Sequence, residues 1–273
     1  MEQPRIQAGL GIAIRAALAA GREIMDVYTD PKQDFGIERK ADNSPLTLAD
    51  KAAHRCIMKY LEQTELPVLS EEGMHESYEK RRGWEAFWLV DPLDGTKEFI
   101  KKNGEFTVNI ALVLNGRPHL GVIYVPAHRV LYYGDPLLGA YKITDIEEWK
   151  EGDTLPQLIE RSQRLPLPQR DKESFVVVAS RSHLSSETQD FIDRAKTEHP
   201  HVETISSGSS LKICLVAEGT ADVYPRFAPT MEWDTAAGHA IACCAGRQVF
   251  QAGTETPLEY NKKDLHNPWF LVK

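Results

Sequence analysis

Two aspartates placed three residues apart, Asp91 and Asp94, form the part of the sequence best suited to chemistry. They stand in the segment DPLDGT, which directly follows the apolar run 87–90. Hard cations such as Mg²⁺ take oxygen ligands, and these two carboxylates with the carbonyl of Leu93 would supply three. Gly95 permits unusual backbone conformations, and a helix beginning there could hold a phosphate oxygen with its free N–H groups. The alternative is a short acidic turn in which an aspartate only caps a helix.

Three further carboxylates lie in segments where a structural explanation competes with a chemical one. Glu71 belongs to LSEEG, which could also be a solvated acidic turn. Asp234 belongs to EWDTAAG, where an aspartate in a first helical turn could serve the helix dipole alone. The small residues after it would let that helix approach another backbone closely, as a site assembled across two halves requires. Asp50 lies three residues after Thr47 and could complete a capping box.

The overall charge limits the partners that such a site could serve. The 273 residues hold 32 Lys and Arg against 40 Asp and Glu, a formal net charge of −8. This balance argues against nucleic acid as the main partner, and an acidic protein that handled an acidic substrate would need bound cations. No apolar run approaches the roughly 20 residues of a membrane span. We expect a cytoplasmic protein whose four cysteines are reduced, buried thiols.

Other common catalytic arrangements are absent from the sequence. There is no GxSxG elbow, no GxxxxGK[ST] loop and no HExxH. His199 and His201 flank a proline but lack partners at zinc spacing. A serine hydrolase or a zinc enzyme is therefore not expected.

Periodicity predicts a first half of helices on a mostly antiparallel sheet and a second half that alternates strands with helices. Two helices open the chain, the second from Thr47, and Asn115-Gly116 is typical of a hairpin turn. Residues 145–172 carry acidic residues and three prolines, which indicates a connection with one short helix. The strands expected are 68–69, 87–90, 106–114, 120–125, 132–133, 140–143, 175–179 and 222–224, and the later helices are 209–218 and 232–245.

Three segments, taken in order, resemble the motifs of the inositol monophosphatase-like, Mg²⁺-dependent, lithium-sensitive phosphatases: LSEE, WLVDPLDGT and WDTAAG. The resemblance covers essentially the whole chain. Finer features are similar to the bacterial 3′(2′),5′-bisphosphate nucleotidases of this superfamily, namely KEFI and NGEF after the DGT, SRSH, GSSLK and YPRF. The segment 145–172 is longer than this family leads us to expect, which bears on the connection and not on the site.

The resemblance implies a role for each residue of the site. The ligands of a first Mg²⁺ would be Glu71, Asp91 and the Leu93 carbonyl, and those of a second would be Asp91, Asp94 and Asp234, with two or three ions in all. Thr96 with Asp50 or Glu71 would orient the attacking water. The substrate contacts would be Glu71, Leu93, Asp94, Gly95, Thr96, Asp234 and, for the nucleoside and its 5′-phosphate, His183, Ser209, Lys212 and Arg226.

The resemblance also implies a reaction. We expect Mg²⁺-dependent hydrolysis of the 3′-phosphate of adenosine 3′,5′-bisphosphate (PAP) to AMP and phosphate, in sulfur assimilation. The alternatives are an inositol monophosphate or inositol polyphosphate 1-phosphatase and a non-catalytic metal- and nucleotide-binding sensor. Bacterial relatives leave open a loose attachment to the inner face of the membrane, and the oligomeric state is open.

The implied fold is an α/β (α+β) layered αβαβα sandwich. It would have a mostly antiparallel N-terminal sheet, a smaller mixed C-terminal sheet and the active site at their junction. We divide the chain into an N-terminal half (1–144), a connection (145–172) and a C-terminal half (173–273).

Overall fold

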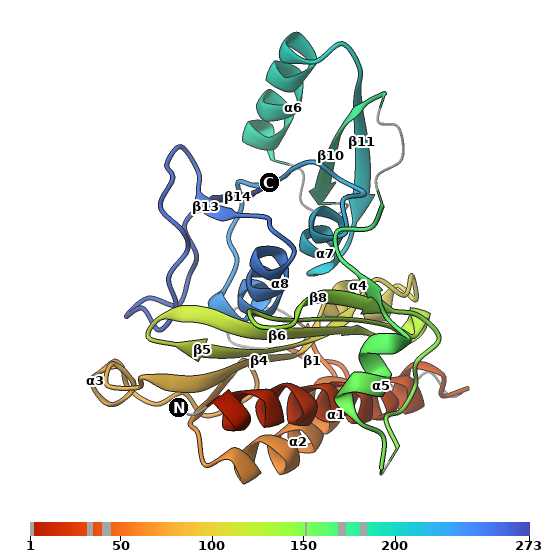
Figure 1. Cartoon of the computed structure of the whole chain (residues 1–273), viewed down its shortest axis with the longest axis vertical. Helices are drawn as coiled ribbons and strands as arrows, with labels where there is room; N and C mark the ends of the chain where they lie inside the picture. The colour runs from red at the N-terminus through yellow and green to blue at the C-terminus, as the bar shows by residue number, and fades with distance from the viewer. Residues whose placement is uncertain (1–2, 32–34, 40–44, 151, 169–172, 181–184) are drawn as a thin grey trace.

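The computed structural model describes residues 3–31, 35–39, 45–150, 152–168, 173–180 and 185–273, which stack as alternating layers of helix and sheet (Figure 1). The first layer is the helix pair α1 (Gln3–Tyr28) and α2 (Leu48–Leu61), which lies under a seven-stranded sheet. Above that sheet lie α7 (Leu211–Ala217) and α8 (Glu232–Cys244), then the smaller sheets, then α6 (Ser186–Glu198). The predicted αβαβα sandwich is confirmed.

The large sheet is mostly antiparallel, as predicted. In order across the sheet its strands are β3 (Val68–Ser70), β4 (Ala86–Asp94), β5 (Thr107–Leu114), β6 (Arg117–Val125), β7 (Val130–Asp135), β8 (Gly139–Ile143) and β9 (Gln163–Arg164). Within the described chain, β3 and β4 form its one parallel pair. Asn115 and Gly116 join β5 to β6 with φ of 49° and 73°, the left-handed values of a two-residue type I′ turn. The predicted hairpin is therefore confirmed.

Both faces of the large sheet are buried, because helices cover each of them. Along β4, Trp88 and Val90 pack into the core that contains α1 and α2, whereas Phe87 and Leu89 pack into the core that contains α7 and α8. This period of two with apolar residues on both sides explains why the sequence reads as a continuous apolar run. The polar residues that end the run consequently lie at the edge of a rigid, doubly covered sheet.

Helix α8 lies unusually close to the large sheet. A Cβ atom added to Gly121 of β6 would come within 2.2 Å of the Ala237 carbonyl oxygen. On the other side of the helix, a Cβ on Gly238 would come within 2.9 Å of Ile213 on α7. The small residues that follow Asp234 thus permit the close approach that their sequence predicted.

The second half of the chain forms two small sheets. One is the parallel pair β10 (Phe175–Ser180) and β11 (Val202–Ser207), and the other is the antiparallel set β12 (Tyr224–Arg226), β14 (Phe270–Val272) and β13 (Val249–Gln251). A parallel bridge between Val177 and Val223 connects them, so parallel and antiparallel strands meet in this half, in two sheets where one mixed sheet was predicted. Sequence patterns did not indicate α6, β11, β13 or β14.

The segment between the halves contains the short helix that its sequence predicted, α5 (Leu155–Glu160). It also contains β9, which pairs with β8 at the edge of the large sheet. Arg15 of α1 donates to the carbonyl of Trp149 at 2.8 Å and lies over the Trp149 ring. The segment therefore packs against the first helix, while the division of the chain at 144 and 172 stays a prediction.

The remaining short elements are β1 (Glu38–Arg39), β2 (Pro45–Leu46), η1 (Glu62–Thr64), α3 (Tyr78–Arg81), α4 (Thr96–Ile100) and η2 (Pro126–His128).

The sequence predicted no membrane span and four buried, reduced cysteines. In the part of the chain that is described, no helix has both the length and the apolar character needed to cross a membrane. All four cysteines are free thiols. Cys214 is buried but Cys243 is exposed, so the expectation that all four are buried is wrong.

The contact between Gly121 and α8 predicts a strong effect of a single methyl group. Gly121→Ala should lower the free energy of unfolding by about 3 kcal/mol, because the new Cβ would meet backbone atoms that cannot move aside cheaply. The measurement is urea unfolding. Gly11→Ala is the matched control, since its Cβ would lie 3.5 Å from Trp149 and alanine favours the helix by about 0.5–1 kcal/mol. Equal stability of Gly121→Ala and the parent protein would contradict this packing.

Candidate active site

The end of the parallel strand pair brings the first carboxylates together. Glu71 directly follows β3, and its backbone N–H donates to the carbonyl of Val90 on β4 at 3.1 Å. Asp91 and Asp94 lie at the end of β4, where the pairing with β5 becomes irregular. Because parallel strands end at the same edge, Glu71 and Asp91 lie close enough for a hydrogen bond between their carboxyl groups. Glu71 is half-buried here and is therefore not simply a solvated turn residue.

Asp234 reaches this edge from the opposite side. It lies in the first turn of α8, and its Oδ2 accepts a hydrogen bond from the backbone N–H of Met231 at 2.8 Å. The Ser210 hydroxyl lies 2.7 Å from Asp94 Oδ2 and 2.7 Å from the backbone carbonyl of Asp234, and it can donate to either. Asp234 thus caps its own helix, as the structural explanation required, and also lies within the acidic group.

The charges of these carboxylates are poorly balanced by the protein. Burial raises the pKa of Asp91 well above its usual value, and the charges of Glu71, Asp94 and Asp234 raise it further. Burial likewise raises the pKa of Asp234, followed by the charges of Asp94 and Glu71. For Asp94, burial raises the pKa, while the Ser210 hydrogen bond and the Lys212 charge oppose the rise. The site therefore gathers more negative charge than its own surroundings stabilise.

This donor set fits a hard cation. The candidate ligands are carboxylate oxygens and the Leu93 carbonyl, without sulfur or imidazole among them. Among the residues that the structure describes, no three acidic, His or Cys side chains converge tightly enough to enclose an ion by themselves. Mg²⁺ usually keeps several waters and takes only one or two carboxylates plus substrate phosphates.

Asp50 uses its two carboxylate oxygens for different contacts. Oδ2 accepts hydrogen bonds from the Thr47 backbone N–H at 2.7 Å and the Thr47 hydroxyl at 2.6 Å, which is the capping box that the sequence suggested. Oδ1 lies 3.3 Å from the Thr96 hydroxyl, which is also 3.4 Å from the Leu93 carbonyl. Asp50 therefore caps α2 and also lies beside the site.

Gly95 supplies the sharp turn that separates the strand from the helix. Its φ of 92° and ψ of 38° lie in the left-handed region, and a Cβ there would come within 3.0 Å of the Glu105 carbonyl oxygen. Helix α4 begins at the next residue, Thr96, and its first turn has no side-chain cap. The N–H of Thr96, the first residue of the helix, can therefore serve a ligand oxygen.

One cavity of about 490 Å³ joins these carboxylates to a cationic region. Its lining includes eight predicted site residues, namely Glu71, Asp94, Gly95, Thr96, Asp234, Ser209, Lys212 and Arg226. Asp50, Asp91 and Leu93 are buried behind this surface. His183 lies outside the described residues.

Lys212 and Arg226, two of the cationic residues that line this cavity, form its cationic region. Lys212 is 4% exposed, and its Nζ donates to the backbone carbonyls of Ser209 at 2.5 Å and Ser207 at 3.3 Å. Burial lowers the pKa of Lys212 to about 8, although the nearby Asp94 charge opposes the change. Arg226 donates one N–H to the Pro229 carbonyl at 3.0 Å. The Arg226 Nε and the Ser209 hydroxyl are buried and have no hydrogen-bond partner among the described residues, so both can serve a ligand.

Sequence reasoning missed two residues that hold Asp94. Asn109 on β5 is 1% exposed, and its amide donates to the Ser210 hydroxyl at 2.9 Å and lies 3.5 Å from Asp94 Oδ2. Ser210 belongs to the GSSLK segment, but no role was predicted for it. A single amide inside the apolar strand sequence VNIALV was the available signal, because a buried amide needs partners.

Comparison with known proteins identifies the family of this chain. The model of the inositol monophosphatase family matches residues 6–269, and the chain therefore belongs to this family. A Shigella flexneri protein named 3′(2′),5′-bisphosphate nucleotidase CysQ is 47% identical over 257 residues, which cover 93% of this chain and 94% of that protein. The protein of the same name from Escherichia coli K12 is 46% identical over 256 residues with the same coverage.

Solved structures show the same relationship. The crystal structure of CysQ from Bacteroides thetaiotaomicron, described as a bacterial member of the inositol monophosphatase family, is 60% identical with a TM-score of 0.92. The match covers 98% of this chain and 97% of the CysQ chain. An inositol monophosphatase from Thermotoga maritima shares the fold, with 21% identity, a TM-score of 0.71 and coverage of 97% and 92%.

The crowded carboxylates predict that an amide at Asp91 stabilises the metal-free protein. The folded-state pKa of Asp91 is raised, so its stability contribution is present at low pH and is lost as pH rises through the folded pKa. Asp91→Asn avoids this loss. In EDTA we expect the variant to melt a few degrees above the parent at pH 8, with a smaller difference at pH 5.

Scanning calorimetry with and without Mg²⁺ measures this effect. Mg²⁺ should raise the melting temperature of the parent more than that of Asp91→Asn, because the ion relieves the same repulsion. The control is Asp193→Asn, since a hydrogen bond from Lys196 lowers the pKa of this exposed carboxyl. A metal-free Asp91→Asn that melts below the parent at pH 8 would refute the charge argument.

Proposed function

We propose that the protein is a Mg²⁺-dependent 3′(2′),5′-bisphosphate nucleotidase that hydrolyses the 3′-phosphate of PAP to AMP and phosphate. One observation carries this proposal: a single cavity is lined both by carboxylates suited to cations and by the cationic Lys212 and Arg226. A substrate with two phosphates could place one at each kind of group. The likeness of 46–60% identity to proteins named CysQ supports the same choice.

The arrangement of charges explains why the reaction would need metal ions. A phosphate monoester dianion is repelled by the carboxylates of Asp91, Asp94 and Asp234, and so is hydroxide. Bound Mg²⁺, two or three ions per site in this proposal, would neutralise the phosphate, activate a water and stabilise the leaving oxygen. The ligands would be Glu71, Asp91 and the Leu93 carbonyl on one side and Asp91, Asp94 and Asp234 on the other.

The remaining residues would position the reactants. The Thr96 hydroxyl, 3.3 Å from Asp50 Oδ1, can donate to that carboxylate and accept a hydrogen bond from the attacking water, with Glu71 as the alternative partner. The first N–H groups of α4 at Gly95 and Thr96 would bind phosphate oxygens. Lys212, Arg226 and Ser209 would contact the nucleoside and its 5′-phosphate, and His183 keeps this role as a prediction from sequence.

An inositol phosphatase is the second candidate. An inositol monophosphate would leave Lys212 and Arg226 without a second phosphate. The inositol monophosphatase from Thermotoga maritima is 21% identical to this chain, against 46–60% for the proteins named CysQ. We also propose that the enzyme works in sulfur assimilation in the cytoplasm, which four free thiols support.

Phosphate release from PAP and from inositol 1-phosphate, measured in parallel, tests the reaction. We expect release from PAP to be strongly favoured, to disappear in EDTA, to return with Mg²⁺ and to be inhibited by Li⁺. A preference for inositol 1-phosphate would retain the metal site and refute the proposed substrate. Binding of PAP without turnover would instead favour the sensor.

The role of the cationic residues predicts a selective loss of activity. Lys212→Met and Arg226→Ala should each lower kcat/KM for PAP by about 10- to 100-fold, because a charge-assisted hydrogen bond contributes about 1.5–3 kcal/mol. Adenosine 3′-monophosphate lacks the 5′-phosphate, so at saturating Mg²⁺ its kcat/KM should fall less than that of PAP. Equal losses with both nucleotides would show that these residues do not recognise the 5′-phosphate.

A further inference from the structure

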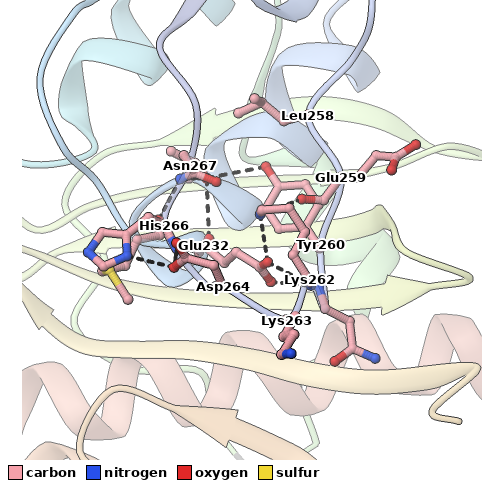
Figure 2. A network of polar contacts seen from close by, with 12 residues as sticks. Glu232, Leu258, Glu259, Tyr260, Lys262, Lys263, Asp264, His266 and Asn267 are labelled. Carbon is pink, nitrogen blue, oxygen red and sulfur yellow. Dashed lines mark hydrogen bonds and ion pairs between the residues drawn. The ribbon is translucent and has the colours of Figure 1, made fainter. Parts of the chain in front are cut away.

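Residues 258–267, which we call the strap, wrap around the first turn of α8 (Figure 2). The first attachment is Glu232, whose side chain is completely buried. Its carboxylate accepts hydrogen bonds from the Asn261 N–H at 2.6 Å, the Lys262 N–H at 3.0 Å and the Lys262 ammonium at 2.6 Å. A buried carboxylate with three donors is a strong and specific anchor.

The strap also holds the residues on either side of Asp234. The Asn267 amide donates to the Met231 carbonyl at 2.7 Å and lies 3.0 Å from the Thr235 hydroxyl. The Tyr260 hydroxyl lies 3.3 Å from the same Thr235 hydroxyl. The helical turn that carries Asp234 is therefore fixed by contacts at residues 231, 232 and 235.

The strap is also hydrogen-bonded to the segment that leads from Glu71 to β4. Arg81 at the end of α3 is 3% exposed and donates to Asn261 Oδ1 at 2.9 Å and to the Lys263 carbonyl at 3.0 Å. The Asn261 amide donates back to the Arg81 carbonyl at 2.6 Å. These contacts connect α8 to the element that follows β3.

A second contact spans the same two elements closer to the carboxylates. The His75 ring packs 5.2 Å from the Trp233 ring, between centroids, and its Nε2 lies 2.9 Å from the Ser70 carbonyl. Ser70 precedes Glu71, and Trp233 precedes Asp234. The strap thus reinforces an interface whose two sides each carry one of the repelling carboxylates.

We propose that the strap is a positioning device that sets the separation of Asp234 from Glu71 and Asp91, and thereby the affinity for divalent cations. Glu232, Asn261 and Arg81 do not line the cavity and act only through the elements that they join. Metal ligands need placement within about 0.5 Å, and the repulsion among these carboxylates works against it. The proposal rests on the proposed function only in that the bound ion is taken to serve phosphate hydrolysis.

Asn261 allows the connection to be cut selectively. Its φ of 68° is left-handed, so Asn261→Gly fits the backbone without strain and keeps the N–H that Glu232 accepts. The variant loses both side-chain hydrogen bonds to Arg81. Asn261→Asp keeps an acceptor for the guanidinium and tolerates the same φ. Glu65→Gly is the matched control, because Glu65 is exposed and also left-handed, with φ of 59°, but directly follows η1.

Calorimetric titration of the substrate-free protein with Mn²⁺ and with Mg²⁺ measures the affinity directly. We expect the dissociation constant to rise about tenfold in Asn261→Gly, the lower end for residues that support metal ligands, and to return toward the parent value in Asn261→Asp. Glu65→Gly should bind as the parent does. In kinetics, the Mg²⁺ concentration for half-activity should rise by the same factor, with kcat at saturating Mg²⁺ retained.

The outcomes separate this proposal from the function on which it rests. If Asn261→Gly lowers the melting temperature but binds both ions like the parent, the strap is merely structural and the proposal is overturned. If the parent binds neither ion, the proposed function fails first. Arg81→Lys cuts the connection from the other side, since an ammonium cannot span both of the Arg81 acceptors, and should weaken binding in the same way.

Discussion

Glu71, Asp91, Asp94 and Asp234 repel one another, and the surrounding fold must hold them together. Burial raises the free energy of each ionised carboxyl group, and neighbouring charges raise it further. Local donors compensate in part: the Leu93 N–H for Asp91, and the Met231 N–H for Asp234. The remaining electrostatic repulsion destabilises the metal-free protein, and a bound cation relieves it. Such a site stabilises the metal-bound protein at the expense of the metal-free one.

Holding repelling groups together requires a rigid frame on both sides of the gap. The large sheet provides one side, because its faces are covered by helices and β4 is buried over its whole apolar length. Helix α8 provides the other, and it reaches the sheet because Gly121 leaves room for the Ala237 carbonyl and Gly134 leaves room for the Ile241 backbone. Close backbone packing leaves little freedom for α8 to move away, so the frame resists the repulsion of the charges that it carries.

The local parts of the fold and site could be predicted from sequence, whereas the long-range supports could not. Strand β4, the Asn115-Gly116 turn and the Thr47 capping box each depend on neighbours within a few residues, so their patterns are visible. The Arg81–Asn261 contact joins residues 180 positions apart, and no local pattern records such a pairing. Strand β9 has two residues and carries no period at all. The sequence likewise offered two uses for Asp50, and only the geometry shows that its two oxygens have separate contacts.

The cationic and acidic parts of the cavity are electrostatically coupled, and this coupling bears on selectivity. Lys212 is held by backbone carbonyls, and its charge is felt at Asp94, while burial lowers its own pKa to about 8. A phosphate bound beside Lys212 would favour the charged ammonium, and a cation bound at Asp94 would take over the neutralisation that Lys212 supplies in part. The cation removes part of the negative charge that favours the Lys212 ammonium, and the anion restores it, so the two ligands complement each other electrostatically. The metal and the second phosphate of a substrate therefore bind through the same set of charge interactions.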